Sequence, residues 1–458
     1  MAESLDRDLE RADRLTRDVQ VGLPARNAAV ALLQAVLDKG QSLDAAFSEH
    51  LRQGTLTSLG QRDRALARAI AATALRRKGQ IEAIFQGLLE RPIKGRTGAL
   101  QAIVLVAMTQ ILFMETPVHA VVNLAVHQCK RDRQARRFDR LVNAILRRVA
   151  ETGPETAAAQ DAPRLNTPDW LWERWSAAYG PDRARRIAEA HLSEAALDLT
   201  VKSDRNGWAR RLDGLVLPTG SVRLKGRGRI EKLDGFDEGQ WWVQDAAAAL
   251  PARLLGNVAG KRVADLCAAP GGKTAQLAHA GAKVTAVDIS KKRLGHLAGN
   301  LKRLKLTAKR VEADATAWSP SEPFDAVLLD APCSATGTIR RHPDIPHLKR
   351  PSDIEKLGEL QARLLAHGVS LVRPGGRLVY CTCSLEPEEG ERQIARLLAA
   401  QPGVRIDPID PGEVPGCDAS VTKEGYLRTL PFQLATAESG LDGLDGFFVA
   451  RLAVEGTS

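Results

Sequence analysis

The most regular pattern in the chain is helical and covers residues 21–150. Apolar residues recur there at three- and four-residue intervals, first in ARNAAVALLQAVLDKG and again in RDRALARAIAATALRRKGQIEAIFQGLL. That spacing places the apolar side chains on one face of an α-helix. Few strand-like runs interrupt it, so the pattern predicts an all-α bundle over residues 21–150. The preceding residues 1–20 are charged throughout, and we expect them to form a disordered tail.

The pattern loosens after this bundle. Residues 151–166 are rich in Ala, Pro and Thr, and we interpret them as a linker. Residues 167–240 combine the helical runs PDWLWERWSAAYG and RARRIAEAHL with short strand-like runs such as LDLTVK and GLVLPT. The basic stretch SVRLKGRGRIEKL alternates apolar and polar residues, which is typical of a strand pair. These features predict a small α/β module over residues 167–240.

Strands alternate with helices over residues 241–455. The candidate strands are RVADLC, KVTAVDI, KRVEADA, DAVLLDAP and RLVYCTCS, and DGFFVARLAV is expected to form a late antiparallel strand. This alternation is typical of a parallel sheet in a doubly wound, Rossmann-like α/β fold. Ligands of such folds bind beyond the carboxyl ends of the strands. Because DLCAAPGGKT, VDIS, DAPCS and YCTCS all lie at such ends, we expect them to converge on one crevice.

Composition narrows the class of protein. The chain has 458 residues, of which 44% are apolar, which is enough for several folded domains. The longest apolar stretch, AIVLVAMTQILFM, is interrupted by Gln110 and is shorter than the ~20 residues that span a bilayer. The first twenty residues lack the apolar segment of a signal peptide. We therefore expect a cytoplasmic protein, a monomer, with no membrane partner.

Charge and cysteine usage point to nucleic acid and to thiol chemistry. The net charge is +10, and residues 51–150 alone hold 18 Lys and Arg against 6 Asp and Glu. A basic helical region is typical of a nucleic-acid binder, although a solvated Arg-rich surface gives the same count. The six cysteines form no C-x-x-C pair, so we expect no metal site. Four of them fall within residues 267–383, near strand ends.

The loop DLCAAPGGKT, residues 265–274, has three competing interpretations. A phosphate-binding P-loop needs a glycine five residues before Gly272, but that position is Cys267. The dinucleotide pattern G-x-G-x-x-G is also absent. The remaining interpretation is a nucleoside-type cofactor without a phosphate chain, such as S-adenosylmethionine. Asp288 lies 16 residues beyond Gly272, close to the ~20 typical of ribose-binding acids, and Asp314 ends the next strand near the expected adenine.

The other strand-end clusters fit methyl transfer onto a pyrimidine. Carbon 5 of cytosine is a poor nucleophile, and a thiolate added to carbon 6 makes it enamine-like, which is nucleophilic covalent catalysis. The chemistry needs an activated cysteine and a group that contacts the ring. The chain offers Cys333 in DAPCSATG, Cys383 in YCTCS, and Asp330 beside the Pro-Cys pair. Spacing does not decide which of the two cysteines attacks.

The ordered motifs DLCAAPGGKT, AVDIS, LLDAPCSATG and TCS resemble those of the RsmB/NOP family of RNA cytosine-5 methyltransferases, which includes the bacterial Sun-type enzymes. PVHAVVNLAVHQCKR and FDRLVNAILRRV resemble the NusB-like RNA-binding domain fused to that enzyme. GTIRRHPDIPHLKR, residues 337–350, resembles the segment after its Pro-Cys motif. The resemblance covers about residues 20–455. It implies a class I methyltransferase domain preceded by a NusB-like domain and an RRM-like module, with S-adenosylmethionine as cofactor and 16S rRNA as partner.

The resemblance also implies roles for single residues. Cys383 of TCS would be the nucleophile, Cys333 would assist product release, and Asp330 would contact the base and the methyl-donor region. Asp288 and Asp314 would hold the ribose and adenine. The cofactor loop would comprise Cys267, Ala268, Ala269, Pro270, Gly271, Gly272 and Lys273. The chain departs from the family at PEEGE, where Gly390 stands in the place of a common Asn, and this leaves the role of that cluster open.

Two other functions compete with this hypothesis. One is a non-catalytic RNA-binding assembly factor that keeps a relic methyltransferase fold, but intact Cys383, Cys333 and Asp330 argue against decay. The other is an ATPase, which the broken P-loop disfavours. Cys381 shares a strand face with Cys383, and we interpret it as a packing residue. His342, between Arg and Pro, is interpreted as lining the substrate or as structural.

Overall fold

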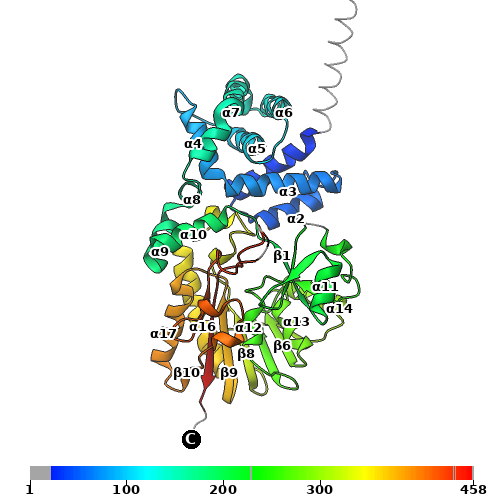
Figure 1. Cartoon of the computed structure of the whole chain (residues 1–458), viewed down its shortest axis with the longest axis vertical. Helices are drawn as coiled ribbons and strands as arrows, with labels where there is room; N and C mark the ends of the chain where they lie inside the picture. Colours follow the sequence, from blue (N-terminus) through cyan, green and yellow to red (C-terminus); the bar gives the residue numbers. More distant parts are fainter. Residues whose placement is uncertain (1–21, 227–228, 437, 439, 456–458) are drawn as a thin grey trace, which may run out of the picture. The chain divides into compact units, whose positions relative to one another are not determined.

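The computed structural model describes residues 22–226, 229–436, 438 and 440–455, so the predicted tail over residues 1–20 lies outside the described residues. The chain forms two compact units. The first extends to Glu173 and also takes in the short segment His342–Lys349; the second contains Arg174–Arg341 and the chain from Arg350 onward. Figure 1 shows the elements of each unit. No helix among the described residues is long and apolar enough to cross a membrane.

The first unit is helical, as the apolar spacing predicts. Residues 22–37 are helical, and the chain continues through α2 (Leu43–Gln53), α3 (Gln61–Arg76), α4 (Lys78–Gly87), α5 (Leu100–Phe113), α6 (Val118–Arg131), η1 (Ala135–Phe138), α7 (Asp139–Ala159) and α8 (Ala162–Leu165). Helix α5 is apolar on all sides and forms the centre of the bundle, since it packs against α3, α4, α6 and α7. Helix α9 (Asp169–Tyr179) spans the boundary between the two units.

Residues 151–166 differ from the expected linker, because α7 continues through most of them. The buried stripe Val142, Ile145, Leu146 and Val149 has helical spacing, and Gly153 occupies the next position of the same stripe. A Cβ atom at Gly153 would lie 2.8 Å from a methyl carbon of a leucine of α5, so the glycine allows close packing there. Packing against α5 therefore extends a helix that local composition alone had marked as loose.

The segment His342–Lys349 packs within the first unit, although it follows the Pro-Cys motif in sequence. The Asp344 carboxylate accepts a hydrogen bond from the backbone N–H of Leu43, at the start of α2, over 3.0 Å. The Nε2 atom of His347 lies 2.9 Å from the backbone oxygen of Leu75, and the side chain of Leu348 packs against the helical core. The helical unit is thus built from two separate stretches of sequence.

The second unit begins with α10 (Pro181–His191) and a small antiparallel sheet in the order β2-β3-β1-β4. Its elements are β1 (Leu197–Val201), α11 (Arg205–Arg211), β2 (Gly214–Val216), β3 (Val222–Leu224) and β4 (Trp241–Val243). The strand pair predicted over SVRLKGRGRIEKL is wrong: among the residues of this segment that the structure describes, 221–226 and 229–233, β3 is the only strand, and η2 (Ile230–Lys232) follows. Because β3 pairs with β2 on one side and β1 on the other, it has no free edge for a following strand.

The larger sheet has the order β10-β12-β9-β8-β5-β6-β7, and β11 pairs with β12. Its strands are β5 (Arg262–Leu266), β6 (Lys283–Asp288), β7 (Lys309–Glu312), β8 (Phe324–Asp330), β9 (Val372–Thr382), β10 (Val404–Ile406), β11 (Leu427–Thr429) and β12 (Phe447–Val454). The strands from β9 to β7 run parallel, and β12 is antiparallel to β9, as DGFFVARLAV predicted. This mixed, Rossmann-like sheet confirms the predicted fold class.

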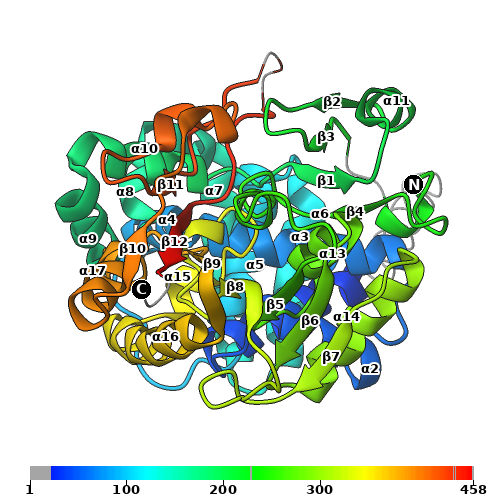
Figure 2. The same ribbon diagram turned by 90° about the horizontal axis from the view of Figure 1, so that it is seen from below.

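Helices cover both faces of this sheet (Figure 2). Helices α12 (Leu250–Arg253), α13 (Gly272–His279) and α14 (Lys291–Arg303) pack on one face, and α16 (Pro351–Ser370) and α17 (Glu391–Ala400) pack on the other. The chain runs from β5 outward to β7 and then crosses to β8 on the opposite side of β5. Such a change of direction leaves a crevice at the carboxyl ends of the central strands.

Candidate functional site

The loop after β5 turns sharply into α13. Cys267 has φ 60° and Gly271 has φ 102°, and both values lie in the left-handed region. A side chain at Gly271 would also meet Leu297 of α14 at 2.8 Å, so only glycine fits this position without strain. Burial raises the pKa of the Cys267 thiol to about 12, which suits packing rather than nucleophilic attack. The loop therefore makes a tight turn with little room for side chains, and its contact with a cofactor remains a prediction.

Asp288 ends β6 and braces this loop. One carboxylate oxygen accepts a hydrogen bond from the backbone N–H of Ala269 over 3.2 Å, and the other accepts from the N–H of Ser290 over 2.9 Å. The side chain is only 2% exposed, and the guanidinium of Arg293 lies 3.4 Å away. The next residue, Ile289, is 68% exposed. An apolar side chain that projects beside a buried carboxylate suits a ligand with one polar and one flat apolar part, and sequence reasoning had overlooked it.

Asp314 follows β7 and is exposed. Its carboxylate accepts hydrogen bonds from the backbone N–H and the hydroxyl of Thr316, over 2.9 and 2.8 Å, and these bonds lower its pKa. The residue therefore caps a turn at the same edge of the sheet as Asp288. Its predicted contact with an adenine remains a prediction.

Asp330, at the end of β8, joins the loop to the cysteine clusters. Lys273 donates a hydrogen bond to one carboxylate oxygen over 2.7 Å, and Cys381 donates to the other over 3.4 Å. Burial alone lowers the pKa of an ammonium, but the Asp330 carboxylate outweighs that effect and raises the pKa of Lys273 above its ordinary value. Lys273 thus stays charged and buried, with a proton to donate at the floor of the crevice.

The two candidate nucleophiles face each other. The Sγ atoms of Cys333 and Cys383 lie 3.4 Å apart, although the residues are 50 positions apart in sequence. The adjacency of β8 and β9 produces this pairing, because each cysteine follows the carboxyl end of one of these strands. The hydrogen bond between the thiols, together with burial, raises the pKa of Cys333 well above its ordinary value. Either sulfur can donate in this hydrogen bond, so the geometry brings the two thiols together without deciding which of them attacks.

Two buried acids had no role assigned from the sequence. Asp265, the first residue of the loop motif, accepts a hydrogen bond from Thr274 over 2.5 Å, and burial raises its pKa to about 7. Glu389, within PEEGE, is fully buried and accepts hydrogen bonds from both cysteine loops. An acid inside an otherwise apolar strand was a visible signal for Asp265. The role of Glu389 depends on contacts between distant segments.

The structure also shows where Cys381 and His342 lie. Cys381 is buried and in contact with Asp330, and burial raises its pKa, which agrees with packing. His342 lies in the helical unit, where its Nδ1 atom is 3.5 Å from a carboxylate oxygen of Asp44. The contact of His342 in this structure is thus with a helix of the first unit.

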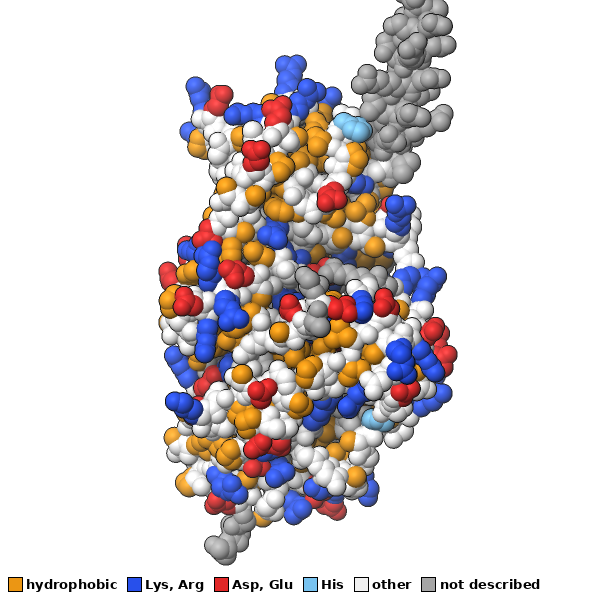
Figure 3. Space-filling view, in the orientation of Figure 1, with side chains coloured by type: hydrophobic (Ala, Val, Ile, Leu, Met, Phe, Trp, Pro, Cys, Tyr) orange, Lys and Arg blue, Asp and Glu red, His pale blue; other side chains and the backbone are white. Residues whose placement is uncertain are grey.

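The helical unit carries an unpaired basic surface. The nine cations of this surface lie in the 91–96 loop and around η1, and Arg137 donates a hydrogen bond to the backbone oxygen of Arg96, which joins the two stretches. They are Arg91, Lys94, Arg96, Lys130, Arg131, Arg133, Arg136, Arg137 and Arg140. Over the described part of the chain, none of them forms an ion pair. Figure 3 shows Lys and Arg side chains gathered at the end of this unit that carries α6 and α7. A surface of this kind attracts a polyanion.

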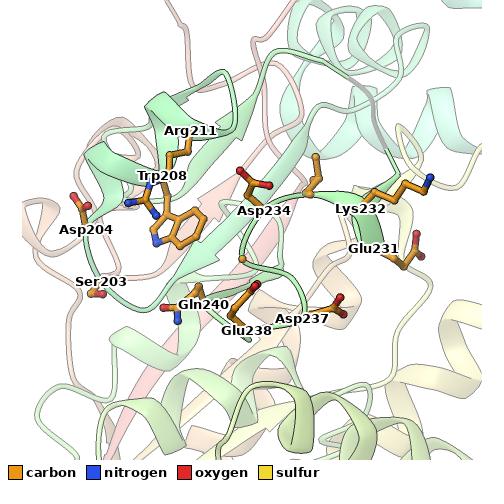
Figure 4. Close-up of a pocket in the computed structure, with 12 residues that line it drawn as sticks. Ser203, Asp204, Trp208, Arg211, Glu231, Lys232, Asp234, Asp237, Glu238 and Gln240 are labelled. Atoms are coloured by element: carbon orange, nitrogen blue, oxygen red, sulfur yellow. The ribbon is translucent and has the colours of Figure 1, made fainter.

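A hollow of about 870 Å³ on the small sheet has the opposite charge. Its lining contains five acidic side chains and two basic ones, and Figure 4 shows Trp208 beside Arg211 and Asp204 within it. It contains neither thiol and none of the residues of the cofactor loop. The carboxylates would repel phosphate, so this hollow is not expected to bind the RNA backbone.

Comparison with known proteins agrees with the geometry. Residues 252–453 match the model of the 16S rRNA methyltransferase RsmB/F family, and residues 23–151 match the NusB family. The ribosomal RNA small subunit methyltransferase B of Vibrio cholerae is 37% identical over 86% of this chain and 94% of its own length. The crystal structure of PH0851 (TM-score 0.68, 23% identity) covers 94% of this chain and 99% of its own. A methyltransferase homolog from Pyrococcus horikoshii (TM-score 0.53, 28% identity) covers 64% of this chain and 97% of its own.

Proposed function

Because this chain belongs to the RsmB/F family of methyltransferases, we propose that it methylates carbon 5 of a cytosine in 16S ribosomal RNA through a covalent cysteine adduct. The observation that carries the proposal is the facing pair of thiols, Cys333 and Cys383, 3.4 Å apart. A cytosine that presents its carbon 5–carbon 6 edge to this pair would meet one thiol at carbon 6 and the other near carbon 5. RNA presents such a base unpaired or flipped out.

The cofactor loop, Asp288, Ile289 and Asp314 suit S-adenosylmethionine. The backbone of residues 267–273 allows close approach, the buried carboxylate of Asp288 suits ribose hydroxyls, and exposed Ile289 suits the face of a purine ring. When bound, this cofactor supplies a methyl group on a sulfonium. The remaining chemistry belongs to the chain's own residues.

The nucleophile is assigned to Cys383. Its thiolate adds to carbon 6, and the electron pair displaced from the ring double bond makes carbon 5 nucleophilic toward the methyl group. The Cys333 sulfur lies 3.4 Å from the Cys383 sulfur, so in this proposal the Cys333 thiol donates a hydrogen bond to the attacking Cys383 sulfur. After transfer, Cys333, whose own proton has passed to solvent, acts as a thiolate base and takes the proton from carbon 5. The electron pair left behind re-forms the ring double bond, the carbon–sulfur bond breaks, and Cys383 leaves as a thiolate.

Lys273 and Asp330 serve the pyrimidine ring in this proposal. Addition at carbon 6 places negative charge on the ring, and a hydrogen-bond donor at N3 stabilises it. The ammonium of Lys273 donates a hydrogen bond to Asp330 over 2.7 Å, and this bond fixes the position of the ammonium. The pair thus orients the base while the thiol attacks.

The basic surface of the helical unit is assigned to ribosomal RNA. Its nine cations form no ion pair with any residue that the structure describes, so each can contact a phosphate, and the counterions that they release make binding depend on salt concentration. This contact positions the RNA but does not read its sequence.

Trapping of the adduct tests the mechanism. Purified Cys333→Ala protein, incubated with 16S RNA and methyl donor, should accumulate a protein–RNA complex that survives denaturing electrophoresis, because addition needs only Cys383 and release also needs Cys333. Cys383→Ala and the double variant should form none. An adduct that forms with Cys383→Ala and vanishes with Cys333→Ala would reverse the two roles. Bisulfite sequencing of 16S rRNA from cells with and without the protein identifies the methylated cytosine.

A further inference from the structure

A buried carboxylate connects the two cysteine loops. Glu389, at the end of η4 (Pro387–Glu389), has no exposed surface. Its carboxylate accepts hydrogen bonds from the backbone N–H of Ser334 over 2.9 Å and from the Ser334 hydroxyl. It also accepts from the Ser384 hydroxyl over 2.5 Å and from the Gln361 side chain over 3.0 Å. Four donors thus converge on one side chain.

The two serines are the residues that directly follow the two thiols. Ser334 follows Cys333, and Ser384 follows Cys383, so Glu389 holds one loop with each contact. The serine hydroxyls also lie 3.1 Å from each other. Because the loops come from different strands, their separation is not fixed by local backbone geometry. The Gly337 N–H also donates to the backbone oxygen of Cys383 over 3.0 Å, and Glu389 adds an acceptor shared by the residues that directly follow the two thiols.

The surroundings of Glu389 are fixed on further sides. Gln361 of α16 donates both to Glu389 and to the backbone oxygen of Pro332, over 2.9 Å, just before Cys333. The backbone oxygen of Glu389 accepts from the Tyr380 hydroxyl over 2.7 Å and from the Thr382 hydroxyl over 3.2 Å, both in β9. A carboxylate that is hydrogen-bonded on all sides has one preferred position.

Among the described residues, every hydrogen bond to the Glu389 carboxylate comes from a neutral group, and no ion pair involves it. Its neighbours Glu388 and Glu391 instead pair with arginines. Burial of an unpaired carboxylate is costly unless its acceptors are filled, and hydrophobic side chains in its place would avoid that cost. Its position between the two loops therefore indicates a function beyond packing.

We propose that Glu389 is a positioning residue that sets the separation of Cys333 and Cys383, so that one thiol can add to the base while the other stands ready for release. The value of this separation for catalysis rests on the proposed two-cysteine mechanism. The hydrogen bonds by which Glu389 holds the two cysteine loops, called the clamp below, are present in the protein without RNA or cofactor. The two parts can therefore be tested separately.

The first experiment measures the clamp directly. A trivalent aryl arsenical oxide condenses with two thiols, forming two arsenic–sulfur bonds and releasing one water, and it binds tightly only where both thiols reach one arsenic atom. Binding of the arsenical to this thiol pair is measured as the difference in binding between the wild type and Cys333→Ala, which lacks one of the two thiols. In Glu389→Gln one acceptor oxygen becomes an amide donor, so we expect the arsenical to dissociate at least tenfold faster. Glu388→Gln, the matched control, should match the wild type.

The second experiment measures the consequence for turnover. Glu389→Gln should lower kcat at least tenfold, leave the KM for RNA within twofold, and accumulate the covalent complex, because release depends on the position of Cys333. Ser384→Ala should lower kcat less, and it should add little to Glu389→Gln, since both changes remove the same contact. Glu389→Asp, which keeps both acceptor oxygens, should recover part of the lost rate.

Unchanged arsenical dissociation or unchanged kcat in folded Glu389→Gln would overturn the proposal, as would an equal effect of Glu388→Gln. If Glu389→Gln does not fold, Ser384→Ala carries both measurements with the same signs. Absence of a covalent complex in every variant, Cys333→Ala included, would refute the proposed mechanism of methylation, and the arsenical measurement would still decide whether Glu389 holds the thiols.

Discussion

Removal of the Asp288 carboxylate should weaken cofactor binding, and a control variant can distinguish this effect from a general loss of stability. The side chain accepts two backbone hydrogen bonds, from Ala269 in the cofactor loop and from Ser290 at the start of α14. Arg293 lies 3.4 Å from one of its oxygens, and the proposed ribose contact would use the remaining acceptor positions of the carboxylate. Hydrogen bonds to a charged acceptor are worth ~1.5–3 kcal/mol, so Asp288→Ala should weaken cofactor affinity roughly ten- to hundredfold.

The same change also has a cost in stability. Two buried N–H groups would lose their acceptor, at ~1–3 kcal/mol each, unless water replaces the carboxylate. Asp288→Asn keeps one carbonyl oxygen and should therefore lose less stability, while the lost charge still weakens ribose binding. Asp325→Ala is a matched control, because Asp325 accepts a backbone hydrogen bond from Arg262 over 2.8 Å at the opposite, amino-terminal end of β8.

Titration calorimetry with S-adenosylmethionine measures the affinity, and urea unfolding measures the stability of each variant. We expect both alanine variants to lose stability and only Asp288→Ala to lose affinity. A folded Asp288→Ala protein that binds the cofactor within twofold of the wild type would refute the ribose role. Equal losses of affinity in Asp288→Ala and Asp325→Ala would show that general loosening of the sheet, rather than a ribose contact, controls binding.

Three further predictions follow from other parts of the molecule. Reversal of Arg136 and Arg137 to Glu should weaken RNA binding and flatten its salt dependence in filter-binding assays, with cofactor affinity unchanged; wild-type salt dependence would mean a merely solvated surface. The raised pKa of Asp265, about 7, means that the folded state keeps a proton that the unfolded chain releases near pH 4, so its stabilising effect is present at low pH and lost as the pH rises to 7. Urea unfolding at pH 5 and pH 7 should therefore show ~2 kcal/mol less pH dependence in Asp265→Asn than in the wild type, and equal slopes would contradict the buried protonated acid. Gly337→Ala should destabilise the protein by ~1–3 kcal/mol, because its Cβ would lie 1.9 Å from a backbone oxygen beside β12, whereas Gly295→Ala in α14 meets open space and should not destabilise it.

The sequence alone determined most of the elements and the family. Helical spacing over residues 21–150 predicted a bundle, and the alternation after residue 241 predicted a parallel sheet. Both predictions are confirmed, because periodicity records which face of each element is buried, and that is a local property. The order of motifs also identified the family, which the comparisons confirm.

Local patterns failed where packing between distant segments decides the structure. The linker predicted over residues 151–166 is largely helical, because α5 supplies a partner for the stripe that ends at Gly153. The second strand predicted after residue 221 does not form in the described residues of that segment, because β3 already has a neighbour on each side. The segment His342–Lys349 joins the helical unit, a placement that no periodicity in its eight residues could indicate.

At the candidate site, too, the sequence determined some features and the tertiary structure decided others. The sequence determined that Cys333, Cys383, Asp330 and Lys273 would lie near strand ends, but it left open which of them meet. Strand order decided that β8 and β9 are neighbours, and this adjacency brings together the loops that carry two thiols 50 positions apart in sequence. The contacts of Glu389 with both cysteine loops follow from the same adjacency. Strand order depends on the summed burial of whole elements rather than on any one segment, so only the tertiary structure could decide it.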